Sequence, residues 1–273
     1  MRRRDLLWSG AAALGLVGRA DPQSTSERKP FVWPGGAKAA VSLTYDDGLN
    51  SQLDNVVPML SRFDLKATFF LTGMNIEPRV GDWRKVGEAG HEIGNHTTHH
   101  LCRLHDISPT VFDRQEIEDM EAYLAANFDR GRVPIYAYPC GVLQLGKGGE
   151  VEEQLRYVRL LKAHFAAARA ALGEPNDPRF VVERRYALQA TAPTYYLDDP
   201  RLATDYVKSA IASGRWAILI FHNVFDSRRA DGDTSLQTHE TILSWLVAQP
   251  IWCAPMGAVL RRLGVLHESS PTA

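Results

Sequence analysis

Two adjacent carboxylates and two nearby histidines are the residues of this 273-residue chain best suited to chemistry. Asp46 and Asp47 follow the apolar segment 41–45 and precede a glycine. Neighbouring like charges raise each other's free-energy cost of ionisation, so the pair calls for a cation, a shared proton or solvent. His96 and His100 are four residues apart, which on one helical turn brings both imidazoles to the same side, where they can share a metal.

Together these residues predict a catalytic metal site. Two neutral imidazoles and one carboxylate supply three ligands and leave a coordination position for water, as expected of catalytic rather than structural zinc. One aspartate then binds the cation, and its neighbour accepts a proton from the water. Taken separately, the same residues are also compatible with a solvated turn at 46–48 and with two hydrogen-bonded surface histidines.

The elements that must position these residues follow from the hydrophobic pattern. Strands are expected at 39–45, 67–71, 90–94, 133–138, 216–221 and 251–253, and helices at 51–62, 81–89, 108–128, 150–171, 200–213, 235–248 and 256–263. For the helix that begins at 150, an earlier end near the strand-like Phe165 is the alternative. Continuously apolar strands that alternate with helices indicate a parallel sheet covered by helices. Chemistry in such sheets and barrels lies at the carboxyl ends of the strands, where residues 46–48, 95–100, 138–141 and 222–223 are expected.

Composition and the N-terminal segment restrict the class of protein. The formal charge of −1 gives no overall basic field, so we expect no nucleic-acid partner. Three consecutive arginines at positions 2–4 precede a short apolar stretch, which predicts a twin-arginine-like export signal over residues 1–20, with a retained anchor or a plain basic terminus as the alternatives. The apolar stretch is too short to span a bilayer, so we expect a periplasmic or secreted mature protein without a stable membrane span.

These signals divide the chain into an export signal (1–20), a linker (21–36), one catalytic domain (37–264) and a tail (265–273). The three cysteines, Cys102, Cys140 and Cys253, are too few for a disulfide framework and are expected to be small buried apolar residues. The sequence makes no prediction of the oligomeric state.

Three motifs in this order resemble those of the polysaccharide deacetylases, the NodB homology domain of carbohydrate esterase family 4. The family's T-F-D-D-G corresponds to residues 44–48, its H-[ST]-x-x-H to residues 96–100, and its L-x-H to residues 220–222. The resemblance covers residues 37–264. It implies an α/β fold, a distorted and incomplete (β/α) barrel, and a metal-dependent hydrolase that removes N-acetyl or O-acetyl groups from an amino-sugar polysaccharide or oligosaccharide.

The resemblance also implies roles for single residues. Asp46 would be the general base, His222 the general acid, and the backbone amide of Cys140 an oxyanion donor. Tyr138 and Ile220 would contact the substrate. The metal ligands would be Asp47, His96 and His100, with Zn²⁺ as the expected ion and Co²⁺, Ni²⁺ or Mn²⁺ as alternatives.

Two family features are missing. Where many relatives have R-P-P-Y-G, residues 137–141 read A-Y-P-C-G, so the arginine that orients the catalytic aspartate is absent. Arg169 is a candidate replacement, although a solvated helix position is favoured for it. No fourth motif is found, because Asp82-Trp83 lies too early in the chain. These gaps leave two alternatives: a metal-dependent hydrolase of a small non-sugar amide, and a non-catalytic carbohydrate-binding relative.

Three further histidines are not expected to bind metal. His91 is placed on the strand before the metal turn, His99 is expected to point away from His96 and His100, and His239 is expected to begin a solvated helix.

Overall fold

The structure, a computed structural model, describes residues 31–191, 198–227 and 229–267. The predicted export signal and residues 21–30 of the predicted linker lie outside the described residues. In the part of the chain that is described, no helix is both long enough and apolar enough to cross a bilayer.

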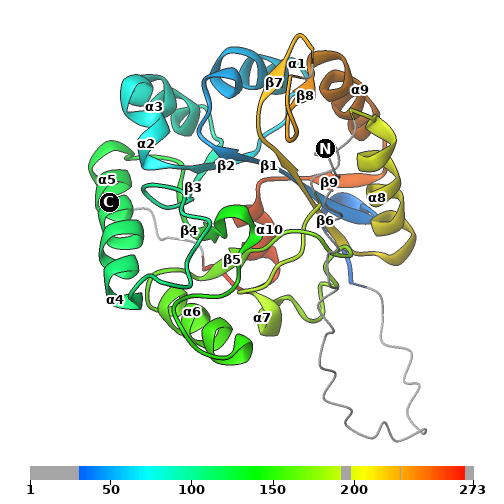
Figure 1. The fold of residues 1–273 in the computed structure, drawn as a ribbon. Helices are drawn as coiled ribbons and strands as arrows, with labels where there is room; N and C mark the ends of the chain where they lie inside the picture. Colours follow the sequence, from blue (N-terminus) through cyan, green and yellow to red (C-terminus); the bar gives the residue numbers. More distant parts are fainter. Residues whose placement is uncertain (1–30, 192–197, 228, 268–273) are drawn as a thin grey trace, which may run out of the picture. The chain divides into compact units, whose positions relative to one another are not determined.

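A parallel sheet of seven strands forms the centre of the domain (Figure 1). Its strands are β1 (Ala39–Asp47), β2 (Thr68–Leu71), β3 (Glu92–Asn95), β4 (Arg132–Ala137), β5 (Ala167–Arg169), β6 (Trp216–Phe221) and β9 (Ile251–Cys253). Their order is β5-β4-β3-β2-β1-β6, and β9 also pairs with β1. The sheet curls, and residues 188–191 bridge its two edge strands through Arg169–Leu188 and Thr191–Leu219 pairs. The predicted incomplete (β/α) barrel is confirmed.

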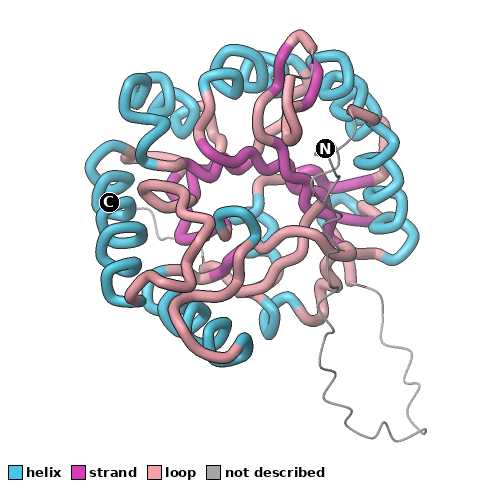
Figure 2. The backbone as a smooth tube through the Cα atoms, in the orientation of Figure 1, coloured by secondary structure: helices cyan, strands magenta, loops and turns pink. Residues whose placement is uncertain are grey.

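Helices surround the curled sheet, as Figure 2 shows. They are α1 (Val57–Arg62), α2 (Gly73–Ile76), α3 (Val80–Glu88), α4 (Pro109–Phe112), α5 (Asp119–Asn127), α6 (Glu150–His164), α7 (Val181–Arg184), α8 (Pro200–Ser213), α9 (Leu236–Val247) and α10 (Met256–Arg262). A π-helical turn at Gln52–Val56 precedes α1, and another at Asp113–Glu118 joins α4 to α5. Two short strands, β7 (Val224–Phe225) and β8 (Thr234–Ser235), pair with each other.

The alternation of side chains along β1 separates two cores. Val41, Leu43 and Tyr45 belong to one apolar cluster, which packs against the surrounding helices. Ala40 belongs to a second cluster, with Ile218 of β6 and Met256 of α10. Since successive side chains of a strand point to opposite faces, Ser42, Thr44 and Asp46 lie on the same face as Ala40. The alternation of side chains along β1 therefore directs Asp46 to the inner face of the curled sheet.

Of the two ends predicted for the helix that begins at 150, the one at 171 is wrong and the alternative near Phe165 is confirmed. Helix α6 ends at His164, and residues 167–169 form β5. Phe165 is already extended (φ −126°, ψ 152°), and the amide of Ala166 donates to Pro134, which starts the pairing with β4. Alanine favours a helix in isolation, but the ladder to β4 overrides this propensity.

Candidate active site

Asp46 and Asp47 lie at the carboxyl end of β1, and an unusual backbone angle turns their carboxylates toward a common neighbour. Asp46 Oδ2 is 3.9 Å and Asp47 Oδ1 is 3.5 Å from Nε2 of His96. Adjacent residues of a regular strand would point to opposite faces. Asp47 has φ +78°, a left-handed conformation that non-glycine residues seldom adopt, so the chain turns at this point. The turn places both carboxylates at one site.

Gly48 is required for the same turn. It also has a positive φ, of +68°, and a Cβ atom there would lie 2.5 Å from a side-chain carbon of Ile76. The carbonyl of Asp47 accepts a hydrogen bond from the Asn75 side chain at 2.9 Å, which holds the turn against α2. The D-D-G motif thus describes a backbone shape as well as two charges.

His96 is held with one nitrogen toward the aspartates. It is 1% exposed and follows β3, which places it beside the end of β4. Its Nδ1 is 2.9 Å from the carbonyl oxygen of Ala137, which can only accept, so Nδ1 carries the proton. Burial, with the nearby charges of His100 and Arg169, outweighs the aspartates and lowers the pKa of His96. The imidazole is therefore neutral, and its Nε2 lone pair faces Asp47.

His100 reaches the same place from a loop and not from the predicted helical turn. Thr97 and His100 have φ of +68° and +54°, so residues 96–100 form no helix. The His100 amide donates to Thr97 Oγ1 at 3.0 Å, and the Thr97 amide donates to Asn95 Oδ1 at 2.7 Å. This turn brings the two imidazole rings to 4.8 Å between centroids, with His100 Nε2 3.4 Å from Asp47 Oδ1. The predicted convergence is present, although its backbone is different.

The three converging atoms fit a cation. Asp47 Oδ1 is buried and has no hydrogen-bond partner among the described residues, although two imidazole nitrogens lie within 3.5 Å. Asp47, His96 and His100 also form a group whose ligand atoms lie within 4.8 Å of one another. An ionised carboxylate only accepts hydrogen bonds, and Nε2 of neutral His96 only accepts. A divalent cation would satisfy these facing lone pairs, so the residues present fit a metal.

Arg169 compensates the charge of Asp46. Its Nη2 lies 2.6 Å from both carboxylate oxygens, the guanidinium is 2% exposed, and it lies over the ring of Phe70 at 5.0 Å. Burial acts to raise the pKa of Asp46, but the charges of Arg169, His96 and His222 lower it below its ordinary value. Asp46 is therefore ionised.

The preferred prediction of a solvated helix position for Arg169 is wrong. The residue ends β5, and alternation along that strand directs its side chain to the same inner face as Asp46. An arginine from a neighbouring strand end thus makes the contact to Asp46 that was expected of the arginine absent at position 137. The signal in the sequence was the strand-like Phe165, four residues earlier.

His222 follows β6, directly beside the end of β1. The pairing of Tyr45 with Phe221 brings the next residues of the two strands, Asp46 and His222, together. A buried side chain also links them: Gln52 Nε2 donates to the carbonyl of Asp46 at 2.5 Å and to that of His222 at 3.1 Å. Nothing in the sequence singles out Gln52, because a glutamine in an amphipathic helix is usually solvated.

The two residues predicted to contact substrate are buried. Tyr138 is 3% exposed, and its hydroxyl donates to the carbonyl of Tyr186 at 3.0 Å. Ile220 is 4% exposed within the inner apolar cluster. Direct contact of these residues with substrate stays a prediction.

Cys140 has a left-handed backbone (φ +54°) just after β4, and its amide has no acceptor among the described residues.

The prediction of buried apolar cysteines is wrong for two of the three. Cys102 and Cys140 are exposed and form a disulfide across 38 residues. Only the fold brings them together, because they lie on loops that follow neighbouring strands. Cys253 is a free thiol, and burial raises its pKa to about 12.

The remaining histidines lie away from the metal group. His99 points to Glu116, with Nδ1 and Oε1 2.8 Å apart, and Nδ1 of buried His91 accepts from the Ala67 amide. The prediction of a solvated His239 is wrong: it is fully buried in α9 with Nε2 2.7 Å from the Tyr45 hydroxyl. Burial lowers the pKa of His239 to about 3.

Comparisons with known proteins agree with this architecture. The profile of the polysaccharide deacetylase family matches residues 35–154. A peptidoglycan-N-acetylglucosamine deacetylase of Bacillus cereus is 37% identical over 81 residues, which are 29% of this chain and 30% of the relative. The chain therefore matches less than a third of that relative's length.

Solved structures share the fold over most of the chain. A polysaccharide deacetylase-like protein from Mycobacterium smegmatis has a TM-score of 0.64 at 15% identity, covering 89% of this chain and 97% of its own. A family 4 acetyl xylan esterase from Clostridium thermocellum, solved with a cobalt ion, has a TM-score of 0.56 at 17% identity, covering 83% and 93%. A pseudoenzyme of carbohydrate esterase family 4, as a mutant with restored activity, has a TM-score of 0.53 at 18% identity, covering 82% and 68%. In its profile match, its curated relatives and its fold, the chain is similar to the polysaccharide deacetylase family.

Proposed function

We propose that this protein is a metal-dependent hydrolase that removes N-acetyl groups, or O-acetyl groups, from an amino-sugar polysaccharide or oligosaccharide. The observation that carries the proposal is the unpartnered Asp47 Oδ1 between two imidazole nitrogens, next to a second carboxylate that Arg169 holds ionised. A protein that only bound sugars would need neither the convergence of lone pairs nor a separate ionised aspartate.

Asp47, His96 and His100 would hold the cation. A bound divalent ion lowers the pKa of water toward neutrality and polarises an acetyl carbonyl. Zn²⁺ suits two imidazoles and one carboxylate, and Co²⁺, Ni²⁺ or Mn²⁺ suit the same donors less selectively. The hydrogen bond from His96 to Ala137 would fix the direction of that imidazole, as outer partners of metal ligands commonly do.

The other residues would move protons and stabilise charge. Asp46, ionised and held by Arg169, would accept the proton of the attacking water. His222, tied through Gln52 to the same strand end, would donate a proton to the leaving amine or alkoxide. The Cys140 amide would donate to the developing oxyanion.

The substrate class and location rest on relatives and on the N-terminal sequence. The Bacillus cereus relative is a deacetylase of peptidoglycan N-acetylglucosamine, a polymer outside the cytoplasm. Residues 1–20 carry the features of an export signal. We therefore propose an acetylated glycan of the periplasm or cell exterior as the substrate.

Acetate release from acetylated glucosamine oligomers, measured with and without a chelator, tests the proposal. We expect chelation to abolish release and an added divalent ion to restore it. Release from small amides but not from any acetylated glycan would favour the small-amide hydrolase. Binding of oligomers by the metal-loaded protein without release of acetate would favour the non-catalytic relative.

A matched pair of substitutions tests the division of roles between the two aspartates and histidines. Asp46→Asn should keep metal binding and lower turnover by about 10²–10⁴-fold, because it removes only the base. His96→Ala should lose both metal binding and turnover. Equal metal loss in the two variants would contradict the assignment of Asp46 as a base.

A further inference from the structure

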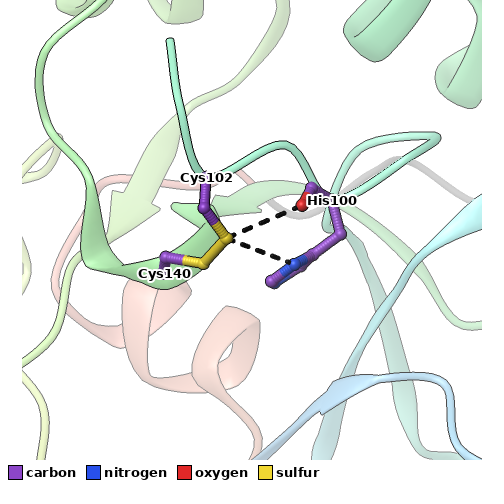
Figure 3. A group of neighbouring side chains, drawn as sticks. All are labelled: His100, Cys102 and Cys140. Atoms are coloured by element: carbon purple, nitrogen blue, oxygen red, sulfur yellow. Dashed lines mark hydrogen bonds between the residues drawn. A yellow bond between two sulfur atoms is a disulfide. The ribbon is translucent and has the colours of Figure 1, made fainter.

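An exposed disulfide joins two of the loops that border the site. Cys102 lies two residues after the metal-ligand candidate His100, and Cys140 supplies the candidate oxyanion amide. Figure 3 shows the sulfur pair beside the His100 imidazole. Cys102 Sγ is 3.9 Å from His100 Nδ1 and 3.8 Å from the His100 carbonyl oxygen. The bond therefore crosslinks the loop after β3 to the loop after β4 at the point where both carry chemistry.

We propose that the Cys102–Cys140 disulfide is a positioning crosslink, which holds His100 at Asp47 and the Cys140 amide in one fixed arrangement. Breaking the disulfide would weaken cation binding and slow turnover. This inference rests on the proposed metal-dependent hydrolase, but its effect on cation binding can be measured without any turnover.

The unequal support of the two histidines is the first argument. His96 has a side chain 2% exposed and donates from Nδ1 to a backbone carbonyl at 2.9 Å. The His100 side chain is 27% exposed, and among the described residues its Nδ1 meets only a sulfur at 3.9 Å, which is a weak acceptor. A metal-binding imidazole usually depends on a carboxylate, carbonyl or water at its second nitrogen to fix its direction. At His100 a covalent bond two residues away supplies the restraint.

Backbone conformation is the second argument. Six described non-glycine residues have a positive φ, and four of them lie at this site: Asp47, Thr97, His100 and Cys140. Such conformations are less favourable for residues with a Cβ atom and persist where the surroundings enforce them. His100 and Cys140 both have φ of +54°, and the disulfide links their two loops. Without the crosslink, both residues would be freer to return to ordinary backbone conformations.

Exposure makes the crosslink accessible to reductant. Both cysteines are exposed, whereas the one free thiol, Cys253, lies partly buried on β9. Reduction by an added phosphine such as tris(2-carboxyethyl)phosphine breaks the S–S bond. The phosphine supplies two electrons and becomes the phosphine oxide, with water supplying its oxygen and the two thiol protons. The protein would then carry three free thiols in place of one.

The test compares Cys102→Ser/Cys140→Ser with the matched control Cys253→Ala, which removes the free thiol and leaves the crosslink. Metal-free samples are titrated with Co²⁺ and followed by visible absorption, and thiols are counted with Ellman's reagent after denaturation. We expect one thiol in the oxidised wild-type protein. We expect a Kd for Co²⁺ about 10-fold or more weaker in the double variant, with unchanged affinity in the control. We also expect a lower kcat with little change in KM.

Equal Co²⁺ affinity and equal kcat in the folded double variant and the control would overturn the proposal, as would three thiols in the oxidised protein. Circular dichroism checks folding first. If the double variant is unfolded, wild-type protein reduced by the phosphine and desalted without oxygen takes its place, with the same two outcomes. If no protein releases acetate, the proposed function fails, while the Co²⁺ titration still decides whether the disulfide positions His100.

Discussion

Buried carboxylates lie at both ends of the curled sheet, and they differ in how completely they are hydrogen-bonded. Glu92 begins β3 at the amino end and is 6% exposed. Its Oε2 accepts from the Gly257 amide at 2.6 Å and from Thr68 Oγ1 at 3.1 Å, and its Oε1 accepts from Arg261 at 2.8 Å. Both oxygens accept hydrogen bonds from the protein, so neither is left without a partner.

At the carboxyl end, Asp47 presents a buried oxygen without a partner toward two imidazole nitrogens, while its neighbour Asp46 is paired with Arg169. A satisfied buried carboxylate holds elements together, whereas an unsatisfied one costs free energy unless a ligand completes it. The difference indicates that the buried carboxylate at the amino end of the sheet stabilises the fold, whereas those at the carboxyl end are available for chemistry, as in complete (β/α) barrels.

The largest effect is expected at the ion pair between the strand ends. Arg169→Met should lower the kcat for acetate release by about 10²-fold, because Asp46 loses its orientation. It should also lower the free energy of unfolding by about 3–5 kcal/mol, because a buried charge is left uncompensated. Steady-state kinetics and urea unfolding measure the two effects.

A double variant provides the control for this prediction. Adding Asp46→Asn to Arg169→Met removes the uncompensated carboxylate, so it should restore part of the stability but none of the turnover. Full activity of Arg169→Met would contradict the orienting role of the arginine.

The amino end should respond in the opposite way. Glu92→Ala leaves the donors of Gly257, Thr68 and Arg261 without their acceptor, so the free energy of unfolding should fall by about 2–3 kcal/mol. Acetate release per folded molecule should stay unchanged. Glu88→Ala, on the exposed side of α3, is the control and should change neither quantity. A loss of turnover in folded Glu92→Ala would show that the two ends are not independent.

An intermediate effect is expected for the link between base and acid. Gln52→Leu removes the donor shared by the carbonyls of Asp46 and His222 without much change in volume. We expect kcat to fall about 10-fold through misplacement of the two side chains, and stability to fall by about 1 kcal/mol. Unchanged kcat together with lower stability would make Gln52 a purely structural residue.

The smallest effect concerns the pH dependence of stability in metal-free protein. Burial raises the pKa of Asp46, but the surrounding charges outweigh it and lower the pKa below 3.8. The ionised Asp46 therefore stabilises the folded protein above pH 3.8, and this contribution is lost as pH falls through the pKa of the folded state. Burial raises the pKa of Glu92 above 4.5 and outweighs its hydrogen bonds and the charge of Arg261, which lower it. The contribution of Glu92 to the stability of the folded protein is therefore present below pH 4.5 and is lost as pH rises through the pKa of the folded state.

The two variants should therefore diverge from wild type in opposite directions. The stability difference between wild type and Asp46→Asn should grow as pH rises from about 3. The difference between wild type and Glu92→Ala should shrink as pH rises past 4.5. Urea unfolding over this pH range measures both, and parallel curves for the two variants would contradict the contrast.

Local patterns in the sequence predict much of this fold. The apolar run before Asp46 marks β1, and its period of two already determines which face the aspartate shares with Ala40. The pairing of His96 and His100 is also predicted, but not its backbone, because positive φ at Thr97 and His100 has no glycine to signal it.

The features that the sequence does not reveal depend on contacts between distant segments. Residues 166–169, A-A-A-R, have a helical propensity that the ladder to β4 overrides, which hides the partner of Asp46. Cys102 and Cys140 become neighbours only because β3 and β4 pair. His239 is buried because α9 packs its face on Tyr45.

A crystal structure of the protein grown with Zn²⁺ tests the central claim most directly. We expect an anomalous peak about 2.0–2.2 Å from an oxygen of Asp47 and from Nε2 of His96 and His100. Asp46 should stay on Arg169 without binding the ion, and one coordination position should be left to solvent. An ion bound by both aspartates, or imidazoles that lie apart with no ion between them, would contradict the account.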